Sequence, residues 1–423
     1  MSMLPPITAA FADYFGLGCM SPLIPFWVES HNGNPSAIGA ILTAQYSGVI
    51  IGSTCAGLFS DRLGRKKTLT FALLGDVVFF TLTAFVGSIN AMIAVRFLAG
   101  LFTPLTASIA WILDISGDDA VKARNQGFFG MASVAGFMLG AAMGGFFGYK
   151  HFKLVNIFCG SLAAFACLNV VKGEEPDPPF ALSEPHGRWR IVRTTLFCSL
   201  AMCNFVVGLQ FTGITTISAI ILPSRFEYKE WQLALAYMGI TFGHFVCLAN
   251  LKRLVSKYGK INLMFMSFLL STLSQIILCF EQSYAHHLLT LGLLTLSSLV
   301  LPLGMTIVNL LSVGVADKFG KNARGATVGF LRTIFNIGQA LGPVYAVFLI
   351  EFRGFNGFQM LKGGWFYVCQ ALLMLLSLVF LKSAWGTNDE VNQRNRLPGN
   401  EGGEGEMQLA AMGIDNEITD RMA

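Results

Sequence analysis

The sequence predicts an all-α membrane protein with twelve transmembrane helices in two pseudo-symmetric six-helix bundles. Only 13% of its 423 residues are charged and 54% are hydrophobic, whereas soluble domains carry about 25% charged residues. The apolar residues occur in runs of about 20, the length of helix that crosses the hydrocarbon core of a bilayer. Lys and Arg gather in the short segments between these runs. Together these observations place most of the chain inside a membrane.

The apolar runs give twelve expected spans, and two changes of composition divide the chain. The first six spans lie at 7–28, 36–58, 68–88, 90–113, 125–148 and 153–172, and the other six at 193–223, 231–251, 261–281, 286–314, 325–350 and 363–383. We expect an N-terminal bundle over 1–172, a cytoplasmic linker over 173–192, a C-terminal bundle over 193–384 and a disordered cytoplasmic tail over 385–423. The linker is rich in Pro and carboxylates and the tail in Gly and Glu, compositions that do not bury a core.

The distribution of cations predicts the topology. Loops on one side of the expected spans hold most of the Lys and Arg residues, while those on the other side hold only Lys150, Lys153, Arg225, Lys229, Arg353 and Lys362. Because cytoplasmic loops carry the excess of Lys and Arg, both termini are expected in the cytoplasm.

A short basic turn between the second and third spans carries the most specific motif. Residues 57–67 read Gly-Leu-Phe-Ser-Asp-Arg-Leu-Gly-Arg-Lys-Lys. This pattern resembles the loop between helices 2 and 3 of the major facilitator superfamily, with every signature position filled. The resemblance implies two related six-helix halves and a substrate site near the midplane between them.

We expect this turn to act as a conformational gate. Gly57 would let a neighbouring backbone approach, and Gly64 would allow the sharp reversal of the chain. Asp61 would pair with an arginine of its own loop or with the positive N-terminus of another helix, and solvated loop charge is the alternative. The resemblance adds charge-relay residues after the fourth span. The expected gate residues are Gly57, Asp61, Arg62, Gly64, Arg65, Lys66, Asp114 and Arg124.

Glycines on the fifth and eleventh spans predict close helix packing and an internal repeat. The spacing of Gly127, Gly136 and Gly140 recurs at Gly329, Gly338 and Gly342. Small faces of this kind let helices approach closely. The fifth span also resembles the glycine-rich signature of proton-driven exporters, although its expected proline is Ala141 here and occurs only in the second half. The expected packing residues are Gly136, Gly140, Gly144, Gly338, Gly342 and Pro343.

Three charged residues inside expected spans are candidates for proton coupling. The motif that begins at Asp13 resembles the first helix of tetracycline/proton and other drug/proton antiporters. Asp76 lies on the third span, where those antiporters also carry an aspartate, about one turn away. Arg96 begins a motif that resembles the arginine signature of proton-coupled members. Because charges inside a bilayer are costly, they mark functional sites. The alternatives are charges at the membrane interface for Asp13 and Arg96.

Polar stripes on two spans of the second half are candidates for the substrate cavity. Arg332, Asn336 and Gln339 share one face of the eleventh span with Pro343, because their spacing follows the helical repeat. The eighth span repeats the pattern with Tyr237, Thr241 and His244. Such stripes face a cavity or another helix rather than lipid. Interhelical hydrogen bonding is the alternative.

These observations predict a secondary transporter and exclude other classes. The sequence lacks a phosphate-binding Gly-rich loop, a metal-ligand cluster and a nucleophile–base pair, so we expect no enzyme activity, metal or cofactor. The most consistent function is proton-coupled export of a drug or metabolite, with a small molecule, protons and the lipid bilayer as partners, by a monomer that binds no nucleic acid. A facilitator or symporter of a metabolite anion is one alternative. A transport-inactive receptor or lipid scramblase is the other.

Overall fold

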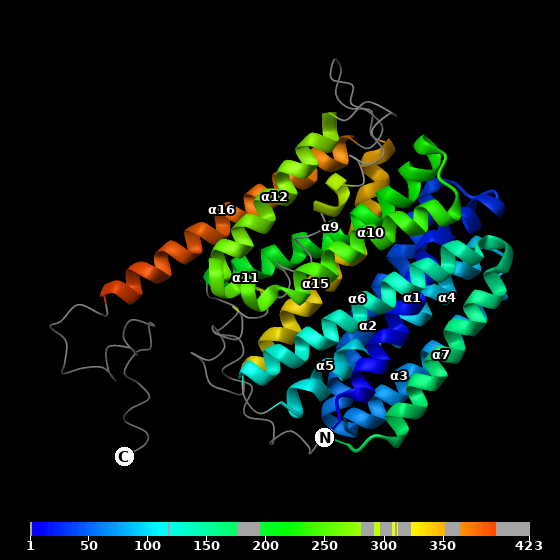
Figure 1. The fold of residues 1–423 in the computed structure, drawn as a ribbon, viewed down its shortest axis with the longest axis horizontal. Coiled ribbons are helices and arrows are strands. Elements are labelled where there is room, and N and C mark those ends of the chain that lie inside the picture. The colour runs from blue at the N-terminus through cyan, green and yellow to red at the C-terminus, as the bar shows by residue number, and fades with distance from the viewer. Residues whose placement is uncertain are drawn as a thin grey trace.

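The computed structural model describes residues 2–116, 119–175, 195–280, 292–296, 307–308, 311, 323–351 and 364–394. Within this part of the chain every regular element is a helix. The first bundle consists of α1 (Leu4–Ser30), α2 (Pro35–Leu63), α3 (Arg65–Thr83), α4 (Ile89–Leu101), α5 (Leu105–Asp114), α6 (Asp119–Phe147), the short η1 (Tyr149–His151) and α7 (Phe152–Lys172). The second consists of α9 (Thr195–Phe226), α10 (Glu230–Ala249), α11 (Leu251–Tyr258), α12 (Lys260–Phe280), α15 (Ala323–Glu351) and α16 (Gly364–Arg394) (Figure 1).

Ten helical segments of the described chain are long and apolar enough to cross a membrane. The predicted third span, α3, is not among them because it carries Arg65, Lys66, Lys67 and Asp76. The predicted tenth span, 286–314, lies mostly outside the described residues. The ten segments therefore correspond to ten of the twelve predicted spans.

Three helix boundaries differ from the sequence prediction. The expected single helix over 90–113 is broken between Leu101 and Leu105, because Pro104 has no N–H to donate to the preceding turn. The loop after α10 contains a further helix, α11, whose apolar Leu254 and Val255 pack against the core of the second bundle. Helix α16 continues to Arg394, so the expected tail boundary after residue 384 falls inside it. The rest of the tail and most of the linker lie outside the described residues.

Glycines join equivalent helix pairs in the two bundles. A Cβ atom at Gly136, Gly140 or Gly144 of α6 would meet the backbone of α1. In the second bundle, a Cβ atom at Gly338 or Gly342 of α15 would meet the backbone of α9. The α1–α6 pair and the α9–α15 pair thus pack in the same way, as expected of two related halves.

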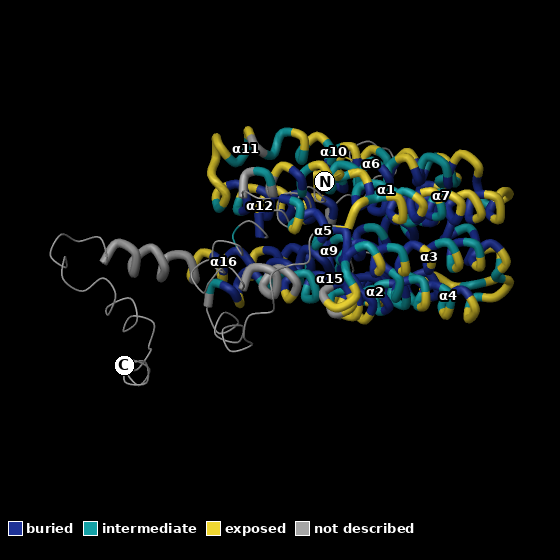
Figure 2. The backbone as a smooth tube through the Cα atoms, turned by 90° about the horizontal axis from the view of Figure 1, so that it is seen from below, coloured by how far each residue is buried: buried dark blue, intermediate teal, exposed yellow. Residues whose placement is uncertain are grey.

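The outer faces of both bundles expose large apolar side chains. Phe85, Phe348 and Val379 expose 64%, 65% and 65% of their surfaces. Figure 2 shows exposed residues along the outer helices around a buried interior. A water-soluble monomer rarely exposes so much apolar surface, and a bilayer covers it.

The two ends of the molecule are packed differently. We call the end with loops 31–34, 84–88 and 227–229 the outer end, after the predicted topology. There a single apolar cluster includes Trp27 of the first bundle with Ile217 and Phe366 of the second. At the other end, within the described part of the chain, each bundle has its own cluster, around Trp111 and Phe268 respectively. The bundles are therefore sealed against each other at the outer end.

Candidate functional site

The basic turn after α2 holds a partly buried ion pair. Gly64 has φ of 96°, a conformation that favours glycine, and it reverses the chain into α3. This places Arg65 at the start of α3, where its Nε donates to Oδ2 of Asp114 at 2.7 Å and its Nη1 donates to Oγ of Ser60 at 2.8 Å. Charge-assisted bonds of this kind contribute about 1.5–3 kcal/mol each, so the pair fixes α5 against α3.

The other positively charged gate residues are more exposed to solvent than Arg65. Arg62 and Arg124 are exposed and Lys66 is half-buried. The side chain of Asp61 lies outside the described part of the structure, so its expected pairing stays a prediction. Among the described residues, the one atom that a Cβ at Gly57 would meet within 4 Å is Cγ2 of Thr106 at 3.9 Å, so the expected close approach of a backbone stays a prediction.

A small cavity of about 50 Å³ lies between the two bundles, near the middle of the helices. The candidates Asp13, Asp76 and Arg96 line it from α1, α3 and α4, and Arg332 and Gln339 line it from α15. These five residues come from four helices of both bundles, and three of the five residues are the charged candidates for proton coupling.

These three charged side chains are buried. Asp13, Asp76 and Arg96 expose 8%, 4% and 1% of their surfaces. Among the described residues, Oδ2 of Asp76 and both Nε and Nη2 of Arg96 have no hydrogen-bond partner. The Cζ atom of Arg96 lies over the Phe80 ring, 5.9 Å from its centre, a distance at which the cation and the ring attract each other. Charged groups are rarely buried in this way unless a function requires it.

The polar stripe of α15 divides between two roles. Arg332 and Gln339 line the cavity, and Cζ of Arg332 lies 5.0 Å from the centre of the Phe335 ring. Asn336 instead donates from Nδ2 to Oγ of Ser53 on α2, at 3.2 Å, and so joins the two bundles. Gly338, Gly342 and Pro343 are buried on this helix beside the stripe.

The polar stripe of α10 does not line the cavity. Tyr237 donates from its hydroxyl to the Thr215 carbonyl of α9 at 3.0 Å, and its ring meets Phe137 of the first bundle edge-on. The Thr241 hydroxyl donates to the Tyr237 carbonyl of its own helix, and His244 is buried. Of these three residues, Tyr237 makes the interhelical hydrogen bond that we gave as the alternative, whereas the hydrogen bond of Thr241 lies within its own helix.

The sequence analysis missed two polar residues of α2 that line the cavity, Gln45 and Tyr46. Neither residue was among the expected cavity residues. An uncharged polar residue inside an apolar span is the signal that identifies such positions, because its amide needs a partner in the bilayer.

Comparison with known proteins identifies the family. The family model described as Major Facilitator Superfamily matches residues 7–343. The chain belongs to this superfamily. The twelve-helix, two-bundle fold predicted from the sequence is the fold of this superfamily, and the chain is an integral multi-pass membrane transporter of a small molecule rather than an enzyme.

Curated relatives of this superfamily member are drug-resistance proteins at low identity. Multidrug resistance protein 1 of Bacillus subtilis (strain 168) is 22% identical over 358 residues, which cover 82% of this chain and 88% of the relative. Quinolone resistance protein NorA of Staphylococcus aureus (strain MSSA476) is 21% identical over 353 residues, which cover 81% and 88%.

Solved structures show the same fold. A mutant of the nucleoside transporter NupG superposes with a TM-score of 0.72 and 11% identity, over 90% of this chain and 99% of that chain. The human organic anion transporter MFSD10 (TETRAN) gives a TM-score of 0.68 and 18% identity, over 90% and 98%.

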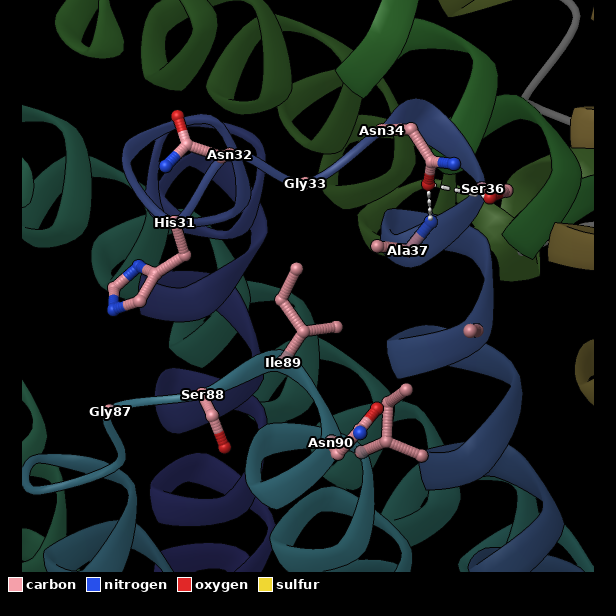
Figure 3. A pocket seen from close by; sticks show the side chains of 12 residues that line it. His31, Asn32, Gly33, Asn34, Ser36, Ala37, Gly87, Ser88, Ile89 and Asn90 are labelled. Atoms are coloured by element: carbon pink, nitrogen blue, oxygen red, sulfur yellow. Dashed lines mark hydrogen bonds between the residues drawn. The ribbon is translucent and has the colours of Figure 1, made fainter.

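A second, larger cavity of about 630 Å³ lies away from the charged residues. It opens at the outer end between the loop before α2 and the loop before α4, and it is lined by His31, Asn34 and Ser88 among others (Figure 3). The Asn34 and Ser88 side chains cap the two helices by accepting from the Ala37 and Ala91 amides. All residues that line it come from the first bundle, whereas a transport cavity must contact both bundles. The small central cavity is therefore the candidate site.

Proposed function

We propose that this protein exports a small organic molecule in exchange for protons, by alternating access of the central cavity. In this proposal the carboxyl groups of Asp13 and Asp76 take up and release the protons. Arg96 and Arg332 supply the positive charges around them, and Gln45, Tyr46 and Gln339 contact the substrate. The relatives support this assignment because their names record resistance to drugs.

The observation that carries the proposal is the grouping of Asp13, Asp76 and Arg96 around one buried cavity. No ion pair within 4.0 Å joins these side chains to one another among the described residues. Two carboxyls buried in one low-dielectric site are costly when both are ionised, so a bound proton or a cationic group of the substrate would relieve that cost. Because the site binds either the proton or the cationic group of the substrate, but not both at once, transport of the substrate is exchanged for transport of protons.

The proposal also assigns the moving parts. The shared apolar cluster at the outer end closes the cavity on that side in this conformation, and the separate clusters at the other end allow the bundles to part there. The Arg65–Asp114 pair keeps the cytoplasmic end of the first bundle rigid during this movement. Both termini and the linker over 173–192 are cytoplasmic in this proposal.

Purified protein in liposomes with a trapped pH dye tests the function. We choose norfloxacin, a quinolone, as the probe because relatives are named for quinolone resistance. An imposed proton gradient should drive accumulation of norfloxacin. Norfloxacin added without a gradient should move protons in the direction opposite to its own movement. Norfloxacin flux without proton movement would leave a facilitator. Absence of flux for norfloxacin, ethidium and a panel of metabolites would favour a receptor or scramblase.

A further inference from the structure

The central cavity contains hydrogen-bond donors and a hydrogen-bond acceptor that have no partner among the described residues. The donor edge belongs to Arg96, of whose side chain only 1% is exposed, and it consists of Nε and Nη2, which have no partner among the described residues. The acceptor is Oδ2 of Asp76, also without a partner there. Both side chains line the same cavity.

The edge of Arg96 formed by Nε and Nη2 is open to a ligand, because neither atom has a partner among the described residues. The Cζ atom of Arg96 lies 5.9 Å from the centre of the Phe80 ring, and Gly16 makes room for this ring, since a Cβ at position 16 would meet it. Two parallel N–H groups on one edge of a guanidinium match the two oxygens of a carboxylate. A planar oxyanion is therefore the group that Arg96 is built to accept.

The acceptor side requires the opposite charge. The carboxyl groups of Asp13 and Asp76 would repel a second anion when ionised, and the oxygen of Asp76 needs a donor. A protonated amine of the substrate supplies both a positive charge and N–H donors.

We infer that the substrate is an amphoteric small molecule whose carboxylate binds the Nε–Nη2 edge of Arg96 while its cationic amine binds Asp76. This inference rests on the proposed exchange function and specifies its substrate class. The enclosed volume of about 50 Å³ suits the charged groups of the ligand rather than a whole drug, so the remainder of the ligand occupies the space between the bundles as they part. Binding of the amine displaces the proton from the carboxyl, which makes the exchange obligatory.

Three related probes separate the two charges of the ligand. Norfloxacin carries a carboxylate and a cationic amine, its methyl ester keeps only the cation, and its N-acetyl derivative keeps only the carboxylate. Loss of a charge-assisted pair should weaken binding to the purified protein roughly tenfold to a hundredfold for each derivative relative to norfloxacin. Equal affinity of norfloxacin and its ester would overturn the role of Arg96, and equal affinity of norfloxacin and its N-acetyl derivative would overturn the role of Asp76. Failure of all three to bind would overturn the assignment.

Two variants assign each charge to its residue. Arg96→Lys keeps the positive charge and loses the planar edge, so its preference for norfloxacin over the ester should shrink while it still discriminates against the N-acetyl derivative. Asp76→Asn loses the negative charge, so it should bind norfloxacin and the N-acetyl derivative equally and still discriminate against the ester. A variant that binds all three probes equally weakly would have a general structural defect and would contradict the assignment. Where a variant does not fold, the comparison of the three probes on the unaltered protein still tests the inference. Norfloxacin binding with the expected preferences but without proton movement in liposomes would refute the exchange function and leave the substrate class intact.

Discussion

The two bundles share a packing scheme but differ in charge. In each, glycines of the fifth helix of the repeat (α6 or α15) lie against the backbone of the first (α1 or α9). The first bundle places two carboxyls and an arginine on the cavity, whereas the second contributes Arg332 and Gln339 and, within its described residues, no carboxylate. A common scaffold can therefore carry an acid–base group in one half only, because helix packing depends on small residues and not on the cavity residues.

The largest expected effect comes from removing the charges that distinguish the first bundle. Asp13→Asn and Asp76→Asn keep the side-chain size and remove the proton-carrying group, so gradient-driven accumulation of norfloxacin in liposomes should fall to the level of empty liposomes. Exchange of labelled for unlabelled norfloxacin should persist. Gln370→Met, a buried position of the second bundle away from the cavity, is the control and should accumulate norfloxacin normally. Full accumulation by either Asn variant would remove that residue from the coupling.

Overpacking one helix contact tests whether the scaffold is shared. At Gly140 an added Cβ would meet the Phe15 carbonyl and lie 3.0 Å from the Cys19 nitrogen, and at Gly342 it would lie 2.6 Å from the Leu209 carbonyl oxygen. Gly140→Ala and Gly342→Ala should each destabilise the protein by about 1–3 kcal/mol in thermal unfolding. On the same helix as Gly140, a Cβ at Gly127 would meet nothing within 4 Å among the described residues, so Gly127→Ala should be neutral or slightly stabilising. Equal stability of all three variants would argue against the common packing scheme.

Weakening the Arg65–Asp114 ion pair of the first bundle should lower the stability of the protein by a similar or smaller amount. Arg65→Lys cannot reproduce the bonds from Nε to Asp114 and from Nη1 to Ser60 together, so we expect a loss of about 1–2 kcal/mol and slower turnover. Arg62→Lys, in the same turn but exposed, is the matched control. If the two variants unfold at the same temperature, the pair does not fix α5 against α3.

Tyrosines in the two bundles should give the smallest effects and distinguish cavity from packing positions. Tyr237→Phe removes one hydrogen bond to the Thr215 carbonyl and keeps the ring, so stability should fall by about 0.5–1.5 kcal/mol while norfloxacin affinity stays unchanged. Tyr46→Phe, on the cavity wall, should weaken norfloxacin binding instead. A loss of affinity in Tyr237→Phe would restore the α10 stripe as a substrate contact.

The sequence predicted the fold well because apolar length, charge and glycine spacing are local properties. It also named Asp13, Asp76 and Arg96 as proton-coupling candidates and, separately, Arg332 as a cavity candidate, since charges inside spans are rarely lipid-facing. Their meeting at one cavity came from the structure. It could not decide that Asn336 binds Ser53 while its neighbours line the cavity, because both arrangements fit one helical stripe. Nor could it show that the α10 stripe turns toward α9, which depends on how the helix is rotated in the bundle.

The most direct test of the difference between the bundles is proton release upon substrate binding. Purified protein in unbuffered detergent solution with a pH dye should release protons when norfloxacin is added, and the double variant Asp13→Asn/Asp76→Asn should release none while still folding and binding norfloxacin more weakly. Unchanged proton release by the double variant would contradict the claim that these two carboxyls of the first bundle carry the exchanged protons.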